Sequence, residues 1–451
     1  MIFEFKNIGP IDRASIELGN LTLICGENNT GKTYLSYGIY GFFAKWGDLF
    51  SKYSLDYLEK QIPTQMKVSK NISWDLLDFK EKLEVEGSKI ISDLYLKELK
   101  NIFSTNENDF VKSHFLVKDL NPILTTWFWN EWKKQELQKP FYPKFLDEKK
   151  IVKIPPPEDI PISDFFGLKI YLNNNTLLAF FETVPQAFIL SPERFITRLF
   201  LPEIDKNRSD LVNTILQNGS NPTKETLEGK VGRYSLPIKH NIDFARDLTY
   251  TTKQNSFLQT EHPEVLTAIE DMLGIEYVVK DGRLLVFDKK TERMLPFDMA
   301  STSVRSLADL HLWLKHKAQK GNILFIDEPE LSLHPANQIK LMRLLVRLVN
   351  VGIKIFMTTH SDYMVKELNN LLKLSYEFPN KEKVMEELGY QQKDILQATD
   401  LKAYITENQT TKLIEIDELG MLTSAFDDAI IQINESSNKL GGIIEGILGA
   451  M

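Results

Sequence analysis

A glycine-rich octapeptide directly after a short apolar segment constrains the fold of this chain more than any other feature. The segment Leu21-Thr-Leu-Ile-Cys25 is typical of a buried strand, and Gly-Glu-Asn-Asn-Thr-Gly-Lys-Thr follows at 26–33. A helix is expected from about Gly31, where the glycine-rich turn ends. Further along, a strand at 322–326, a helix at 338–349 and a strand at 354–357 follow one another, and this order predicts an α/β fold with a parallel sheet.

The octapeptide fits the pattern G-x-x-x-x-G-K-[ST], which is a phosphate-binding loop. Its glycines let successive backbone N–H groups and the helix N-terminus converge on an anion. Lys32 is expected to reach the β- and γ-phosphates, and the Thr33 hydroxyl to ligate Mg²⁺. The predicted cofactors are therefore ATP and Mg²⁺. The predicted nucleotide-binding residues are Gly26, Asn28, Asn29, Thr30, Gly31, Lys32 and Thr33. An ordinary turn rich in glycine and asparagine is the alternative, and the strand before it argues against that.

A second acidic motif follows another apolar segment, Ile323-Leu-Phe-Ile-Asp-Glu-Pro329. Asp327 at a strand end can hold the hydrated Mg²⁺, and Glu328 beside it can act as general base on the attacking water. An Asp-Glu pair alone is common in acidic turns. Its occurrence together with the phosphate-binding loop favours the catalytic interpretation.

A histidine follows the next expected strand, at Thr359-His360-Ser361. A histidine in this place could contact the γ-phosphate, although an isolated histidine is more often structural. Its position after the two earlier motifs favours the catalytic role for His360.

The chain divides into three expected parts. Residues 1–45 and 181–400 are predicted to form the core, with short antiparallel strands at the start. Residues 46–180 read as an inserted, mostly helical lobe that ends near a run of three prolines, and residues 401–451 as a hairpin followed by a helix. Within the lobe, seven lysines stand against four acids over 131–153. Such a segment could contact a nucleic-acid backbone, but a solvated surface is the favoured interpretation.

Composition excludes several classes of protein. The 451 residues carry a net charge of −8, which argues against a general nucleic-acid coat. A single cysteine excludes an intramolecular disulfide framework. No apolar stretch is long enough to cross a membrane, and the first residues do not resemble a targeting signal. We therefore expect a cytoplasmic protein with no membrane partner.

Four segments in order carry a resemblance to a known family: 5–10, the loop at 26–33, Asp327-Glu-Pro-Glu-Leu-Ser-Leu-His-Pro335, and 359–361. Together they resemble the ABC-type ATPase heads of the SMC-like and OLD-like class. They are especially similar to the stand-alone bacterial ATPases of anti-phage systems such as Septu and PARIS. The resemblance implies an ABC-type P-loop NTPase head with an inserted helical lobe. It also implies slow ATP hydrolysis at an interface between two copies, in a sensor or scaffold subunit that controls a separate toxic effector.

The resemblance also implies roles for further residues. His360 would be the switch histidine, and the signature segment that caps the nucleotide of the other copy would be Ser301, Thr302 and Ser303. Ser303 stands where the class usually has glycine, which puts close backbone approach and fast hydrolysis in doubt. Gln186 is the candidate glutamine that senses Mg²⁺, and a surface glutamine is the alternative. The segment 191–194 resembles a Pro-x-Glu-Arg element of these ATPases, whose arginine could simply form ion pairs.

Two other functions stay open at this point. One is an SMC-like head for DNA repair or DNA tethering, against which the acidic composition and the lack of a long coiled coil argue. The other is a scaffold locked by ATP with little turnover, which Ser303 keeps open. The TOPRIM nuclease motifs of OLD-like chains are not evident after His360. A toxic activity is therefore expected to come from a separate protein, and contact with DNA stays open.

Overall fold

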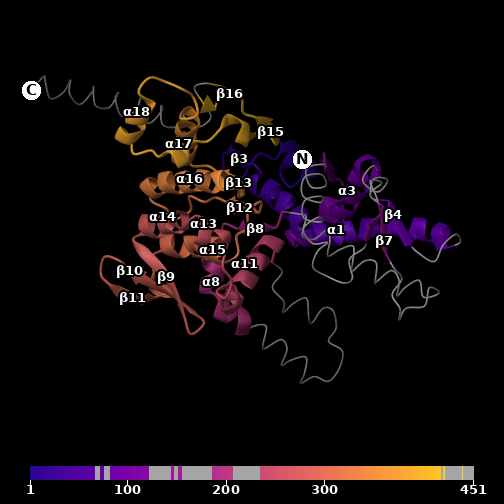
Figure 1. Cartoon of the computed structure of the whole chain (residues 1–451), viewed down its shortest axis with the longest axis horizontal. Coiled ribbons are helices and arrows are strands. Elements are labelled where there is room, and N and C mark those ends of the chain that lie inside the picture. Colours follow the sequence, from indigo (N-terminus) through magenta and orange to yellow (C-terminus); the bar gives the residue numbers. More distant parts are fainter. Residues whose placement is uncertain are drawn as a thin grey trace, which may run out of the picture.

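A sheet of nine strands has the order β5-β1-β2-β15-β14-β3-β13-β12-β8. Its strands β3, β13, β12 and β8 lie at the centre of the molecule (Figure 1). The computed structural model describes residues 1–66, 72–75, 82–120, 144–146, 151–154, 185–206, 234–417, 420–421 and 439. The nine strands are β1 (Ile2–Ile8), β2 (Ile11–Glu17), β3 (Leu21–Gly26), β5 (His114–Lys118), β8 (Ala187–Leu190), β12 (Ile323–Asp327), β13 (Lys354–Thr359), β14 (Leu401–Glu407) and β15 (Thr410–Leu413).

The strands divide into a parallel part and an antiparallel part. Strands β14, β3, β13, β12 and β8 are each parallel to their neighbours in this series. Strand β1 pairs antiparallel with β2 and with β5, at the other end of the sheet. The predicted α/β fold, with a parallel sheet and an N-terminal antiparallel part, is confirmed.

Helices cover both faces of the sheet. Alternate side chains of one strand face opposite layers, as the strand period requires. Leu23 and Leu324 pack in a core with α14, α15, α16 and α17, whereas Ile24 and Phe325 pack in a second core with α1, α3 and α4. The helices are α1 (Lys32–Met66), α3 (Ser88–Leu96), α4 (Leu99–Phe103), α8 (Arg194–Leu199), α11 (Leu236–Arg246), α12 (Leu248–Thr251), α13 (Phe257–Glu261), α14 (Pro263–Leu273), α15 (Thr302–His316), α16 (Pro335–Asn350), α17 (Asp362–Lys373) and α18 (Lys381–Glu387).

Three small sheets accompany the large one, in the orders β11-β10-β9, β4-β7-β6 and β16-β17. Their strands are β4 (Ile72–Asp75), β6 (Lys144–Leu146), β7 (Ile151–Ile154), β9 (Ile275–Lys280), β10 (Arg283–Asp288), β11 (Arg293–Pro296), β16 (Ile416–Asp417) and β17 (Gly420–Met421). Short π- and 3₁₀-helical turns are η1 (Leu83–Gly87), η2 (Glu107–Phe110), η3 (Phe297–Met299), η4 (Gln392–Asp394) and η5 (Ala398–Asp400).

The expected three-part division stays a prediction, but elements cross its boundaries. Helix α1 continues through residue 45, and β5 of the expected lobe pairs with β1 of the central sheet. The hairpin expected after residue 401 exists as β14 and β15, and it lies inside the central sheet between β3 and β2. Long-range strand pairing decides these positions, and the local sequence carries no signal for it.

Two expectations concern residues outside the described ones. The helix expected from about Thr423 to Glu435 lies outside the described residues, and so does most of the basic segment 131–153. Of that segment, only the strands β6 and β7 are described, and they pair antiparallel. Among the helices that the structure describes, none is both long enough and apolar enough to span a membrane.

Candidate nucleotide-binding site

The phosphate-binding loop lies at the carboxyl ends of the parallel strands, between β3 and the start of α1. Gly26 and Gly31 have φ angles of +145° and +95°, which side chains other than glycine rarely adopt. A Cβ atom at Gly26 would lie 2.4 Å from Thr406 Oγ1, and one at Gly31 would lie 2.7 Å from Ile11. Both glycines are therefore required by close packing as well as by the turn.

Lys32 is held by its own loop. Its Nζ donates to the carbonyl oxygens of Gly26 at 2.9 Å and of Glu27 at 2.7 Å. Burial lowers the pKa of Lys32, and the negative charges of Glu328 and Asp327 oppose that effect. The cation is thus fixed inside the loop whose backbone would surround a phosphate chain, so little side-chain ordering is left to occur on binding.

Asp327 ends β12 and is fully buried. Its Oδ1 accepts a hydrogen bond from Thr358 Oγ1, whereas its Oδ2 is buried with no protein partner. Burial raises the pKa of Asp327 to about 6, and the nearby hydroxyl groups of Thr358 and Thr33 oppose that rise. A buried, unpaired carboxylate oxygen beside a threonine hydroxyl fits the oxygen ligands that Mg²⁺ takes. The structure therefore brings together the two residues predicted to hold the metal ion.

Glu328 and His360 also meet at this edge. His360 Nδ1 lies 3.5 Å from Glu328 Oε1 and 3.5 Å from Glu330 Oε1. The backbone of Glu328 is left-handed, with φ of +51°, and its N–H donates to the Thr358 carbonyl at 3.2 Å. The predicted base and the predicted switch histidine are therefore neighbours, although 32 positions separate them in the sequence.

Glu330 holds His360 in place beside Glu328, a role that the sequence does not predict. Its Oε1 accepts from Thr359 Oγ1 at 2.7 Å and from the His360 N–H at 2.9 Å. The carboxylate is buried and holds the turn that carries His360. Nothing in the sequence pattern after Asp327-Glu328 indicates an inward-facing carboxylate.

The signature segment opens α15. Ser301 caps this helix, accepting from the Val304 N–H at 3.4 Å, and its Oγ lies 3.0 Å from Ser303 Oγ. The Ser303 carbonyl accepts from Ser306 Oγ at 2.9 Å. Within one chain, these hydroxyl groups are therefore engaged with one another and with their own helix.

Gln186, the candidate Mg²⁺-sensing residue, lies away from the phosphate-binding loop and Asp327. Its carbonyl accepts from the Ile323 N–H at 2.9 Å, at the start of β12, whereas Asp327 ends that strand. Four residues of strand separate the two positions by about 13 Å. Because β8 and β12 are parallel, the residue before β8 lies at the opposite edge of the sheet. The segment after β8, which begins at Ser191, reaches the site instead.

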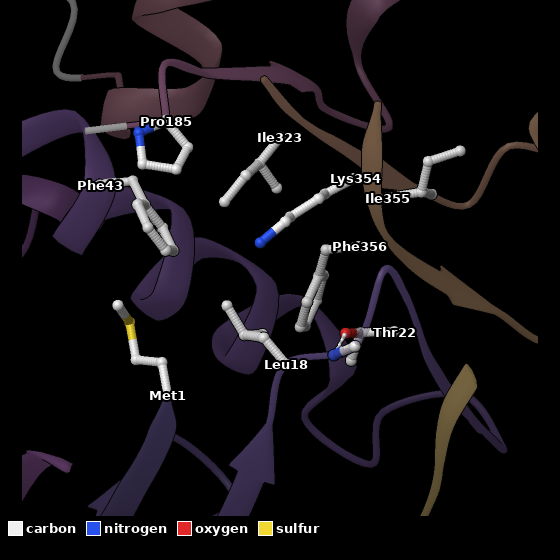
Figure 2. Close-up of a pocket in the computed structure, with 10 residues that line it drawn as sticks. Met1, Leu18, Thr22, Phe43, Pro185, Ile323, Lys354, Ile355 and Phe356 are labelled. Carbon is white, nitrogen blue, oxygen red and sulfur yellow. Dashed lines mark hydrogen bonds between the residues drawn. The ribbon is translucent and has the colours of Figure 1, made fainter. Parts of the chain in front are cut away.

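That opposite edge has a pocket of its own (Figure 2). Its lining is mostly apolar, and Lys354 at the start of β13 points its ammonium group into it. The side chains that face it include Met1, Leu18, Phe43, Ile323, Lys354 and Phe356. This pocket is separate from the phosphate-binding loop, because it lies at the amino ends of the parallel strands.

We predict that Asp327→Asn changes the pH dependence of stability in nucleotide-free, metal-free protein. The usual carboxyl pKa of 3.8 rises to about 6 in the folded state. The folded protein therefore keeps a proton that the unfolded chain loses, and this contribution to stability disappears as pH rises from about 4 to about 6. Above pH 7 the variant should be more stable than wild type by on the order of 1–3 kcal/mol in urea titrations.

Asp288→Asn is the control of opposite sign. The exposed Asp288 carboxylate accepts from the N–H groups of Lys290 and Thr291, which lower its pKa. Its contribution is present at neutral pH and is lost on acidification, so this variant should be less stable than wild type at pH 7. If the free energy of unfolding of the Asp327 variant and of wild type changed with pH in the same way, the raised pKa that burial gives Asp327 would be contradicted.

Comparison with known proteins gives a family match over part of the chain. The AAA ATPase domain family matches residues 198–365, which include Asp327, Glu328 and His360. No curated protein matches the chain. The match over 198–365 supports an ATPase, the class that the motifs predict, with a nucleotide and Mg²⁺ as its expected cofactors.

Solved structures of SMC heads are also similar to the chain, at low TM-scores. An SMC head bound to the C-terminal winged-helix domain of ScpA has 9% identity and a TM-score of 0.34, over 92% of this chain and 96% of that one. The SMC head domain from Thermotoga maritima has 11% identity and a TM-score of 0.31, over 92% and 98%. An SMC head with an extended coiled coil, bound to the C-terminal domain of ScpA from Pyrococcus furiosus, has 11% identity and a TM-score of 0.32, over 97% and 98%. At these values no residue role is transferred from them.

Proposed function

We propose that this chain binds ATP with Mg²⁺ at the carboxyl edge of its parallel sheet and hydrolyses it with Glu328 as the base. The observation that carries the proposal is the unpaired, buried Oδ2 atom of Asp327 beside Thr33, next to Glu328 and the phosphate-binding loop. Lys32 would neutralise the β- and γ-phosphates, and Thr33 and Asp327 would hold the metal ion. When bound, Mg²⁺ neutralises charge on the phosphate oxygens.

The side chains around Glu328 suit proton transfer. Its carboxylate would accept a proton from the attacking water, and His360 at 3.5 Å would orient that carboxylate and reach toward the γ-phosphate. Glu330 fixes the backbone of His360, so the imidazole is held beside Glu328 before any ligand binds. A preorganised pair of this kind does not have to be ordered during the reaction.

Two copies of the chain would complete the site. The hydroxyl groups of Ser301 to Ser303 open a helix whose N-terminus attracts anions, and the resemblance to ABC-type heads places this segment on the nucleotide of a partner. Large side chains near the expected interface support this: Met299 is 71% exposed and Tyr363 is 52% exposed. A second copy would cover them. Ser303 in place of glycine favours slow turnover, and in the limit a scaffold locked by ATP.

The biological role we propose is a sensor or scaffold subunit of a bacterial anti-phage system, in which the ATPase holds or releases a separate toxic effector. It rests on the resemblance of the four motif segments to such ATPases. Release would require that the effector bind one nucleotide state more tightly than another. A DNA-repair or DNA-tethering head is the alternative, and DNA contact through the basic segment at 131–153 would favour it.

Lys32→Ala should weaken ATP binding about tenfold to hundredfold, because it removes a charge-assisted contact with the phosphates. Calorimetry on the folded variant measures this. Lys354→Ala is the matched control, since Lys354 lies at the opposite edge of the sheet. Unchanged ATP affinity in the Lys32 variant would exclude this site.

Glu328→Gln should lower kcat by about 10²-fold to 10⁴-fold, because it removes the general base and keeps the shape of the side chain. ATP binding should survive, and the ATP-bridged dimer should accumulate. Light scattering with and without ATP measures the dimer. Equal rates of hydrolysis in the variant and wild type would show that Glu328 is not the base.

The effector proposal predicts that the purified chain does not cleave DNA or tRNA with Mg²⁺, Mn²⁺ or ATP. It should instead co-purify with the product of an adjacent gene, in an amount that depends on the nucleotide present. Cleavage that a point mutation within this chain abolishes would contradict the proposal and indicate a nuclease within the chain.

A further inference from the structure

Arg194 is the bulkiest of the fully buried side chains in the described part of the molecule. A buried guanidinium usually has a carboxylate partner. Here the donors go to backbone carbonyl oxygens instead. Nε donates to Ser306 at 3.1 Å, Nη1 to Ser191 at 3.1 Å and Asp327 at 3.0 Å, and Nη2 to Glu328 at 2.9 Å. Arg194 therefore links three separate segments through main-chain atoms.

Two of these carbonyls belong to the end of β12, where the proposed metal ligand and the proposed base lie. Glu328 is left-handed at φ +51°, a conformation that costs free energy for any residue with a Cβ atom. Such a conformation persists only where the surroundings impose it. The Thr358 carbonyl oxygen accepts from the N–H of Glu328, and Arg194 donates to the carbonyl oxygen of Glu328. The two contacts fix the backbone on both sides of the Glu328 side chain.

The third segment is the first part of α15, which carries the signature residues. Ser306, whose carbonyl accepts from Arg194 Nε, also donates through Oγ to the Ser303 carbonyl. A continuous series of hydrogen bonds therefore runs from Ser303 through Ser306 and Arg194 to Glu328. The segment expected to face the nucleotide of a second copy is in this way joined to the base of its own copy.

We propose that Arg194 is a positioning residue for hydrolysis, which holds the Glu328 backbone in its left-handed conformation and couples it to the N-terminal part of α15. The inference rests on the proposed function, in which Glu328 is the base. It predicts that weakening the hydrogen bonds of Arg194 to the main chain displaces the Glu328 carboxylate, while the phosphate-binding loop keeps its conformation. The effect should therefore fall on kcat rather than on ATP affinity.

Arg198 offers a matched control. It lies one helical turn further along α8, is also buried, and forms an ion pair with Asp309 of α15. Its guanidinium donates to Asp309, which lies on α15 rather than at the end of β12. Replacing Arg198 loosens the contact between α8 and α15 without touching the Glu328 backbone.

The first experiment compares Arg194→Lys with Arg198→Lys, using kcat at saturating Mg-ATP and the Kd for ATP from calorimetry. Arg194→Lys should lower kcat by about 10²-fold, as small misplacement of a catalytic group does, and leave the Kd within about twofold. Arg198→Lys should lower thermal stability and keep kcat within about threefold. Equal kcat losses in the two variants, or no loss in Arg194→Lys, would overturn the inference.

A second measurement does not depend on turnover. Glycine adopts the left-handed conformation without strain, so Arg194→Lys should cost more stability in a Glu328→Gly background, where no strain is released, than in wild type, where relaxation of Glu328 offsets part of the loss. Urea titrations of the four proteins measure this difference. If Arg194→Lys lowered the free energy of unfolding equally in the two backgrounds, or prevented folding in both, the positioning role would be overturned. If wild type does not hydrolyse ATP, the proposed function fails, while this stability cycle still decides whether Arg194 holds the backbone of Glu328.

Discussion

The parallel register of β3, β13 and β12 is the constraint on which the site depends. In this register Thr358 lies opposite Asp327, and Thr359 lies opposite Cys25, the residue before Gly26. Parallel neighbours end at the same edge, so the segments that follow each strand converge there. The phosphate-binding loop, the acidic pair and His360 therefore meet, although about 300 residues separate the first from the second.

The convergence of these segments buries several charged side chains close together, and hydrogen bonds to neighbouring groups stabilise them. Lys32 uses two loop carbonyls, Glu330 accepts from Thr359 and His360, and Arg194 uses four carbonyls. Asp327 and Glu330 each keep one buried carboxylate oxygen, Oδ2 and Oε2, that has no protein partner, and Oδ2 of Asp327 lies at the proposed position of the metal ion. An unsatisfied carboxylate oxygen costs stability, which is the cost expected where a metal ion binds in the working protein.

The C-terminal hairpin completes the phosphate-binding loop from the other side. Thr406 of β14 lies 2.6 Å from Thr30 through their Oγ1 atoms and donates to the Cys25 carbonyl at 3.1 Å. The Gln409 carbonyl, at the tip of the hairpin, accepts from the Asp12 N–H at 2.8 Å. The loop is therefore enclosed between the antiparallel strands at the start of the chain and a strand added near its end.

The amino-acid sequence was sufficient to predict those parts of the protein whose structure depends on residues close together in the chain. The strand at 21–25, the loop after it, and the acidic pair at Asp327 and Glu328 could all be identified because each has a local chemical reason. The distance of Gln186 from the phosphate-binding loop could not be predicted, because its sequence neighbours predict a strand correctly but do not say which end of that strand faces the loop. Parallel pairing with β12 decided that. Tertiary structure alone assigned Glu330, Arg194 and the hairpin after residue 401 to the site, because their hydrogen-bond partners belong to distant segments that only folding brings near.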